Sequence, residues 1–154
     1  MPALTSGAGV AVLVAAILAL DALIWFGVVR PRIRARRDAA RADAAVALGG
    51  EPPVREGDVR SLGELTRGRA QVRGTGHLAV TDDAIVFTLA VPRRTLRIPR
   101  DHVTGVEEVR THLGKWVGRP VLRVDFLRED GQPDAIAFDV GRDREGWRSA
   151  LTPG

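Results

Sequence analysis

Residues 76–89, GHLAVTDDAIVFTL, decide the fold of the C-terminal part of this chain. Large apolar residues occupy every second position on both sides of the turn-like pair Asp82-Asp83. This alternation is typical of two strands, each buried on one face and joined by a short turn.

The same two-residue period recurs further along the chain. It is carried by Leu96 and Ile98, by Leu122, Val124 and Phe126, and by Ile136, Phe138 and Val140. Turn-forming residues separate these runs: Val91-Pro92, Pro99 to Asp101, Gly118 to Pro120, and Glu129 to Gly131. We therefore predict six or seven short antiparallel strands without a long helix between them.

The C-terminal residues change to a helical pattern. Asp143 is a suitable N-cap, and Trp147 and Leu151 are four residues apart, on one face of a short helix that Pro153 ends. The simplest packing is a small antiparallel sheet with one open end, closed by this amphipathic helix.

Residues 8–29, AGVAVLVAAILALDALIWFGVV, form an apolar run with one ionisable residue, Asp21. As a helix the run would span roughly 33 Å, enough for a hydrocarbon core of about 30 Å. A transmembrane helix is the leading interpretation. A cleaved signal peptide is the alternative, although it usually has a basic N-terminal region and a shorter apolar run.

The arginines predict the orientation of this helix. Residues 1–29 contain no Lys or Arg, whereas a flank of six arginines follows directly. This arginine flank consists of Arg30, Arg32, Arg34, Arg36, Arg37 and Arg41. The positive-inside rule places the flank in the cytoplasm, where it also contacts anionic lipid headgroups. We expect a single-pass inner (cytoplasmic) membrane protein whose residues 1–7 face outward.

Asp21 lies near the middle of the predicted span, where a carboxyl group is costly. One interpretation is a protonated or snorkelling carboxyl that an apolar helix tolerates. The other is a polar contact with another membrane helix. A row of small residues, Gly7, Ala11, Ala15 and Ala19, permits close helix packing but lies on a different face.

The chain has 154 residues, a formal net charge of +4 and a pI of about 11.0. The basic excess lies beside the predicted span, because residues 42–154 hold 17 basic and 17 acidic residues. Nucleic-acid binding is therefore not expected. The sequence contains no Cys, which excludes disulfides and thiolate chemistry.

Between the span and the alternating runs, residues 30–66 show no lasting apolar pattern. Ala and Arg favour helix over 32–48, and Gly49-Gly50 and Pro52-Pro53 end it. Residues 51–60 mix charges with Gly and Pro and indicate a flexible tether. We expect the folded domain to occupy residues 67–154.

Residues 76–87, GHLAVTDDAIVF, and residues 98–107, IPRDHVTGVE, resemble conserved patterns of GRAM and bacterial pleckstrin-homology-like domains. Residues 138–151 resemble the last strand and closing helix of that family, with Trp147 as the anchor of the helix. The resemblance covers roughly residues 67–152. It implies a partly open barrel of about seven antiparallel strands capped by the C-terminal helix, and a binding or scaffolding role without catalysis.

Several motifs with chemical potential have a structural alternative that fits better. The G-x-G-x-x-A match at residues 74–79 precedes a strand pattern rather than a helix, so we assign its glycines to a turn or bulge. The adjacent acids Glu107-Glu108 point to opposite faces of a strand. The three histidines have no metal-binding spacing and are expected at the surface or in turns: His77, His102 and His112. The three serines have no catalytic spacing: Ser6, Ser61 and Ser149. We expect no enzyme activity, metal or cofactor.

Two basic groups in the domain are candidate ligand or partner sites. Four arginines without an acid occur within residues 93–100: Arg93, Arg94, Arg97 and Arg100. They form either a solvated strand face that acids elsewhere balance, or a patch that faces the membrane or an acidic partner. Lys115 and Arg119 flank Trp116 in the Gly-rich segment GKWVGRP. Trp116 is either exposed for contact with a lipid interface or a protein, or packed in the core. We expect the domain to bind a protein within a membrane complex; the alternative is binding of anionic lipid at the cytoplasmic leaflet. The sequence does not determine the partner or the oligomeric state.

Overall fold

A computed structural model describes residues 7–66 and 73–153 of the chain. It divides into two compact units, Met1–Arg36 and Arg37–Gly154, which are described separately. Apart from Gly7, the predicted extracytoplasmic segment 1–7 lies outside the described residues. So does residue 67, where the domain was expected to begin.

A long apolar helix begins in the N-terminal unit and ends in the second unit. Three consecutive helical elements form it: α1 (Gly7–Ile24), the π-helical turn η1 (Trp25–Val29) and α2 (Arg30–Ala47). The stretch Gly9–Ala47 is long and apolar enough to cross a membrane, and its most apolar window is not buried. These properties are shared by membrane spans and signal sequences. The predicted helical extension beyond the apolar run is confirmed up to Ala47.

The helix widens for one turn directly before Pro31. Within this turn the backbone N–H of Arg30 donates to the carbonyl of Trp25, five residues earlier. A proline inside a helix lacks an N–H, and its ring clashes with the carbonyl four residues before it. The π-helical turn therefore accommodates Pro31, and the helix continues through it.

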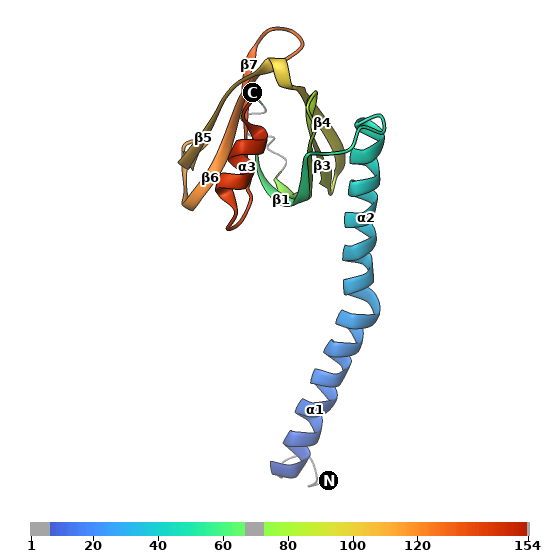
Figure 1. Ribbon diagram of the computed structural model, residues 1–154. Helices are drawn as coiled ribbons and strands as arrows, with labels where there is room; N and C mark the ends of the chain where they lie inside the picture. The colour runs from blue at the N-terminus through green and yellow to red at the C-terminus, as the bar shows by residue number, and fades with distance from the viewer. Residues whose placement is uncertain (1–6, 67–72, 154) are drawn as a thin grey trace. The chain divides into compact units, whose positions relative to one another are not determined.

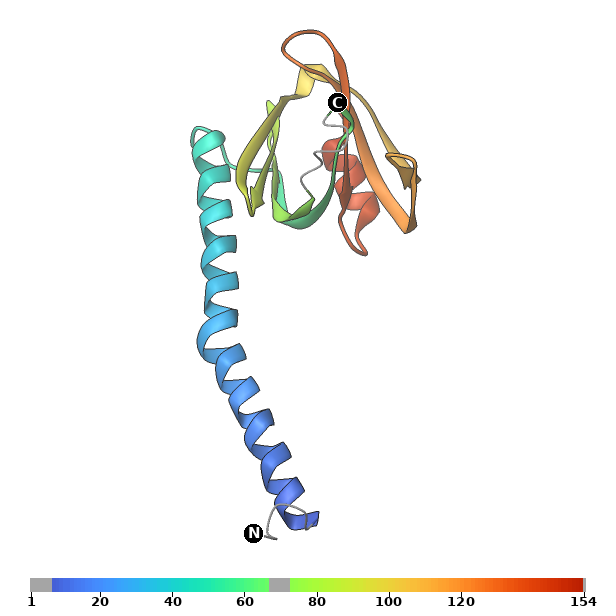
Figure 2. The same cartoon turned by 180° about the vertical axis from the view of Figure 1, so that it is seen from behind.

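The second unit is built on one antiparallel sheet of seven strands in the order β4-β3-β2-β1-β7-β6-β5. The strands are β1 (Arg55–Glu64), β2 (Gly74–Val80), β3 (Ala84–Ala90), β4 (Arg93–Pro99), β5 (Val103–His112), β6 (Lys115–Leu127) and β7 (Pro133–Asp139). Figures 1 and 2 show from opposite sides that the sheet curls into a half-barrel, with β4 and β5 at its two edges. The prediction of about seven antiparallel strands is confirmed.

The core lies on the concave face of the half-barrel. Its fully buried side chains come from the alternating positions that the sequence analysis identified, and they include Leu78, Ile85, Ile98, Leu122, Val124, Ile136 and Phe138. The C-terminal helix α3 (Arg144–Leu151) adds Trp147 and Leu151 to this core. Asp143 caps α3, because its carboxylate accepts from the backbone N–H of Gly146 at 3.2 Å. The predicted closing helix is therefore confirmed.

The sheet begins earlier than expected, because β1 occupies residues that were assigned to a flexible tether. Its inward positions are Gly57, Val59, Ser61 and Gly63, which alternate with the exposed charges of Glu56, Asp58 and Arg60 and with the half-buried Leu62. Only one of the four is a large apolar residue, so a search for apolar alternation did not detect the strand. A Cβ at Gly57 would lie 3.2 Å from the Trp147 ring, so the small residue makes room for α3.

The outer face of β2 and β3 is also buried, in contrast to the one-sided burial that the alternation indicated. Ala44 of α2 packs with Ala84 and Val86 of β3, and Ala47 and Leu48 pack beside them. Ala44 is 1% exposed. The last turns of α2 thus form a second layer on the sheet within this unit, rather than a linker.

Gly76 has a packing role instead of the predicted turn or bulge. It lies inside β2, paired with Leu89 of β3. A Cβ built on Gly76 would lie 2.7 Å from two ring atoms of Phe87 and closer still to the carbonyl oxygen of Thr88. The missing side chain therefore lets the Phe87 ring cover the backbone of β2.

Candidate functional site

Three of the four arginines at residues 93–100 have partners within their own unit. Arg93 Nε donates to Asp43 at 2.9 Å, and this bond raises the pKa of Arg93. Arg94 forms an ion pair with Glu64 at 2.9 Å. These contacts connect β4 with α2 and with β1.

Arg100 closes the C-terminal end of α3. Its guanidinium donates to the carbonyls of Ala150, Leu151 and Thr152 at 2.7–2.8 Å. Burial lowers the pKa of Arg100. A cation at the last carbonyls of a helix also interacts favourably with the helix dipole. The four arginines are thus not brought together as one patch, and Arg97 is the member without such a contact among the described residues.

The arginine flank is divided between the two units. In the second unit, Arg37 pairs with Asp58 at 3.6 Å, and Arg41 pairs with Glu56. In the first unit, the guanidinium of Arg30 lies 5.5 Å from the Phe26 ring centre. The remaining arginines of the first unit, Arg32, Arg34 and Arg36, are exposed on the helix, and so is Asp21.

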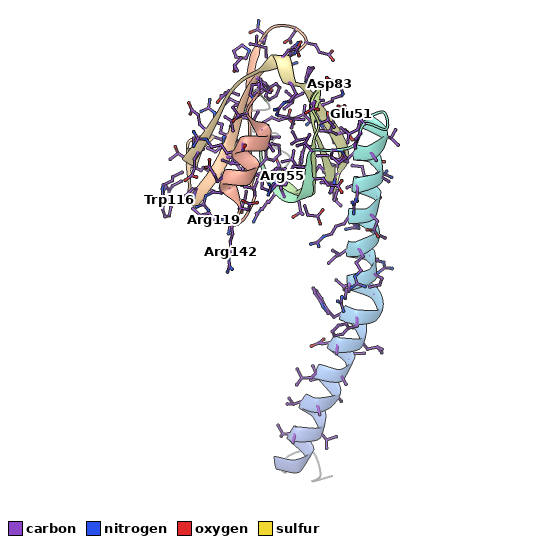
Figure 3. The ribbon with its side chains drawn as sticks, viewed as in Figure 1. Glu51, Arg55, Asp83, Trp116, Arg119 and Arg142 are labelled. Carbon is purple, nitrogen blue, oxygen red and sulfur yellow. The ribbon has the colours of Figure 1, made fainter. Side chains whose placement is uncertain are left out.

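The second basic group lies on the hairpin formed by β5 and β6. Trp116 is 72% exposed, and Figure 3 shows Trp116 and Arg119 at the end of this hairpin. Arg119 forms an ion pair with Asp139 of β7. Lys115, Trp116 and Arg119 all line one cavity of about 440 Å³.

Other residues of this cavity were missed by the sequence analysis. Arg60 from β1 and Arg73, directly before β2, add two cations, and Leu62 adds an apolar contact. Arg60 lies opposite Asp139 in the pairing of β1 with β7. No local motif reveals this grouping, because the fold unites residues that are distant in sequence: Arg60, Arg73 and Asp139 lie 55, 42 and 24 positions from Lys115.

His112 forms part of the cavity wall, although a surface or turn position was expected. It is 6% exposed, and its Nε2 lies 2.9 Å from the carbonyl oxygen of Gly63, to which it donates. Burial is the main cause that lowers the pKa of His112, and Arg123 and Arg73 lower it further. The ring is therefore neutral at pH 7 and serves as a hydrogen-bond donor inside the sheet.

The other two histidines also have structural contacts. His77 is 4% exposed, with Nε2 3.2 Å from Glu56 and Nδ1 3.3 Å from Asp58, so its expected surface position was wrong. His102 is half-buried in the turn before β5, with Nδ1 3.0 Å from the carbonyl of Leu127.

Within residues 7–66 and 73–153, no three His, Asp or Glu side chains form a group that could hold a metal ion. Ser61 is buried in β1 and accepts from the N–H of Gly63. Ser149 lies on α3, and Ser6 is outside the described residues. Glu107 and Glu108 are successive residues of β5, and the glycines of residues 74–79 lie in β2.

Comparison with known proteins gives a likeness of fold. No protein-family model matches the sequence, and no curated protein matches it. Among solved structures, the C-terminal domain of an unknown protein from Leishmania infantum is similar, with a TM-score of 0.50 and 12% sequence identity. The match covers 74% of this chain and 96% of that chain. At this identity the likeness supports the half-barrel architecture alone.

Proposed function

We propose that this chain is a single-pass inner-membrane protein that presents a pleckstrin-homology-like domain to the cytoplasm. The domain binds a protein partner within a membrane complex. The long apolar helix and the seven-stranded half-barrel with its C-terminal helix support this proposal.

The proposed orientation rests on the arginine flank. Basic residues are absent before Arg30 and frequent directly after it, so the flank remains in the cytoplasm. The unbroken helix from the apolar segment into α2 favours a retained span over a cleaved signal peptide. Reporter fusions at both ends of the chain test this topology: only the C-terminal fusion is expected to report a cytoplasmic location.

The proposed family rests on element order. A partly open barrel of seven antiparallel strands followed by one helix is the arrangement that the resemblance to pleckstrin-homology-like domains implies. The sequence motifs of this resemblance lie at residues 76–87 and 98–107.

The exposed indole of Trp116 is the observation that carries the proposal of a protein partner. Tryptophan is enriched among the residues that dominate binding energy at protein interfaces. Trp116 lies on a hairpin at the edge of the sheet, next to a cavity, where a partner has access to both.

Photocrosslinking in membranes tests this assignment. A benzophenone amino acid replaces Trp116 in the full-length chain, and a matched control replaces Arg128, which is exposed on the hairpin between β6 and β7. We expect a discrete protein adduct from position 116 and none of the same mass from position 128. Equal adducts from both positions would contradict the proposed contact.

Binding of anionic lipid is the second candidate function. The contacts of Arg93, Arg94 and Arg100 weaken the original basis for it, since these guanidiniums already have partners. The cations of the cavity near Trp116 are the remaining groups that support binding of anionic lipid. Lipid adducts instead of protein adducts at position 116 would favour this second function.

A further inference from the structure

The cavity beside Trp116 carries an excess of positive charge, although residues 42–154 as a whole hold equal numbers of basic and acidic residues. Four cationic side chains line it, with Asp139 as the single carboxylate: Arg60, Arg73, Lys115 and Arg119. Two other cavities of this unit are balanced. One has Arg55 and Arg100 with Asp82 and Asp101, and the other has Arg97 and Arg128 with Glu129 and Asp130.

Most of this positive charge is available to a ligand. Arg119 is paired with Asp139. Within the part of the chain that the structure describes, Arg60, Arg73 and Lys115 form no ion pair, and Arg60 and Lys115 are exposed. Unpaired cations around one opening create a local positive potential that attracts and orients an acidic ligand.

The pair formed by Arg119 and Asp139 is an ion pair between a guanidinium and a carboxylate within the cavity wall. The cations come from three segments: Arg60 from β1, Arg73 from directly before β2, and Lys115 and Arg119 from β6. Guanidinium groups bind carboxylates through two parallel hydrogen bonds. An array of this kind fits several separate carboxylates along a chain.

The apolar part of the wall favours a peptide over a phosphate headgroup. Leu62, Val117 and the Trp116 ring line the cavity together with the cations. Its volume of about 440 Å³ lies within the range of ligand-binding cavities. A headgroup would use the cations alone, whereas an acidic peptide with one large apolar residue would use both parts of the wall.

We infer that this cavity binds an acidic segment of the partner protein, with partner carboxylates on Arg60, Arg73 and Lys115 and an apolar side chain against Trp116. The inference rests on the proposed function, since it specifies the chemistry of the partner at the same hairpin. His112 also lines the cavity, where its Nε2 donates to the carbonyl of Gly63.

Selection from a random peptide library tests the inference without assuming a partner sequence. The full-length chain is placed in phosphatidylcholine nanodiscs, and phage-displayed peptides of about 12 residues are selected against it. We expect enrichment of peptides that combine Asp and Glu with a large apolar residue. Their binding should weaken when salt is raised from about 0.1 to 0.5 M, because ion pairs at the rim are screened.

Variants then locate the binding site. Lys115→Glu and Trp116→Ala change exposed side chains, and each is expected to weaken a selected peptide about 10-fold or more. Arg128→Glu makes the same charge change at the other cavity and is expected to leave the affinity within about 2-fold. Unchanged melting curves establish that the variants fold.

Three outcomes would overturn the inference: selected peptides without acidic enrichment, equal weakening by Arg128→Glu, or complete displacement of the peptides by phosphatidylglycerol nanodiscs through the same residues. The last result would assign the cavity to lipid. A protein adduct at position 116 without acidic enrichment would leave the proposed function in place and refute only the acidic segment. Selection of acidic peptides that depend on Lys115, without any protein adduct at position 116, would support recognition of an acidic segment and contradict the proposed contact with a protein partner in the membrane.

Discussion

Gly76→Ala tests whether the sheet depends on the close approach of Phe87 to β2. The added Cβ would lie 2.7 Å from two atoms of the Phe87 ring, against 3.4–4 Å for ordinary van der Waals contact. The ring must therefore move by about 0.7 Å or more. Phe87 is 5% exposed and lies 5.1 Å from Phe138 between ring centres, so the core leaves it little room.

The carbonyl of Thr88 makes the conflict harder to relieve. The new Cβ lies closer to this backbone oxygen than to the ring, and the carbonyl is fixed by the pairing of β2 with β3. Overpacking of this kind typically costs about 1–3 kcal/mol of unfolding free energy. The reduced freedom of the unfolded chain returns about 0.4–1 kcal/mol. The expected net loss is about 1–2 kcal/mol.

Gly74→Ala is the matched control in the same strand. Its Cβ would lie 3.2 Å from a terminal methyl of Leu89, a flexible side chain that can shift by a few tenths of an ångström. We expect a change within about 0.5 kcal/mol.

Urea titration of the full-length chain in a non-ionic detergent measures both variants. The buried Trp147 reports unfolding once the other tryptophans, Trp25 and Trp116, are replaced by Phe. Equal midpoints for Gly76→Ala and Gly74→Ala, or a stabilised Gly76→Ala variant, would refute the packing role of Gly76.

Four other variants or titrations address separate parts of the second unit. Ala44→Glu places a carboxylate against Ala84 and should release the end of α2, which limited trypsin digestion would detect as faster cleavage within α2 while the sheet remains folded. Leu151→Ala, at a fully buried position, should cost about 2–5 kcal/mol in a urea titration. Because burial lowers the pKa of His112, protonation favours the unfolded chain, and stability should fall as the pH drops below about 6.5. Melting curves recorded between pH 7 and 5 measure this loss, and His112→Gln should reduce it. The pKa of Asp143 is lowered by its bonds to Arg55 and to the Gly146 N–H, so its contribution is present at neutral pH and is lost as the pH falls through its folded pKa; carbon NMR should show its carboxyl titrating below a free Asp.

Much of the fold was predictable from periodic patterns. Strand positions such as Leu78, Val124 and Phe138 were identified by alternation, and α3 by Asp143 and the spacing of Trp147 and Leu151. These signals are local, because burial on one face fixes the residue type at every second or every fourth position. The strand β1 was missed, since small residues fill its inward positions next to the bulky side chains of α3.

Less of the candidate site was predictable. Lys115, Trp116 and Arg119 could be grouped from the sequence because they are near neighbours on one hairpin. It also grouped Arg93, Arg94, Arg97 and Arg100, although three of these side chains contact α2, β1 and α3 instead. Proximity in sequence does not specify where a long side chain finds its partner, because each partner lies on a distant element.

The sequence alone determined the apolar helix, the position of the basic excess in the arginine flank, and the antiparallel β domain with its closing helix. Composition and period are sufficient for these features, because hydrophobic burial acts on each element separately. The tertiary structure alone decided that α2 covers the outer face of β3, and that Arg60, Arg73 and Asp139 join the Trp116 hairpin around one cavity. Strand pairing and packing between layers create these groupings, and neither leaves a signature in a local stretch of sequence.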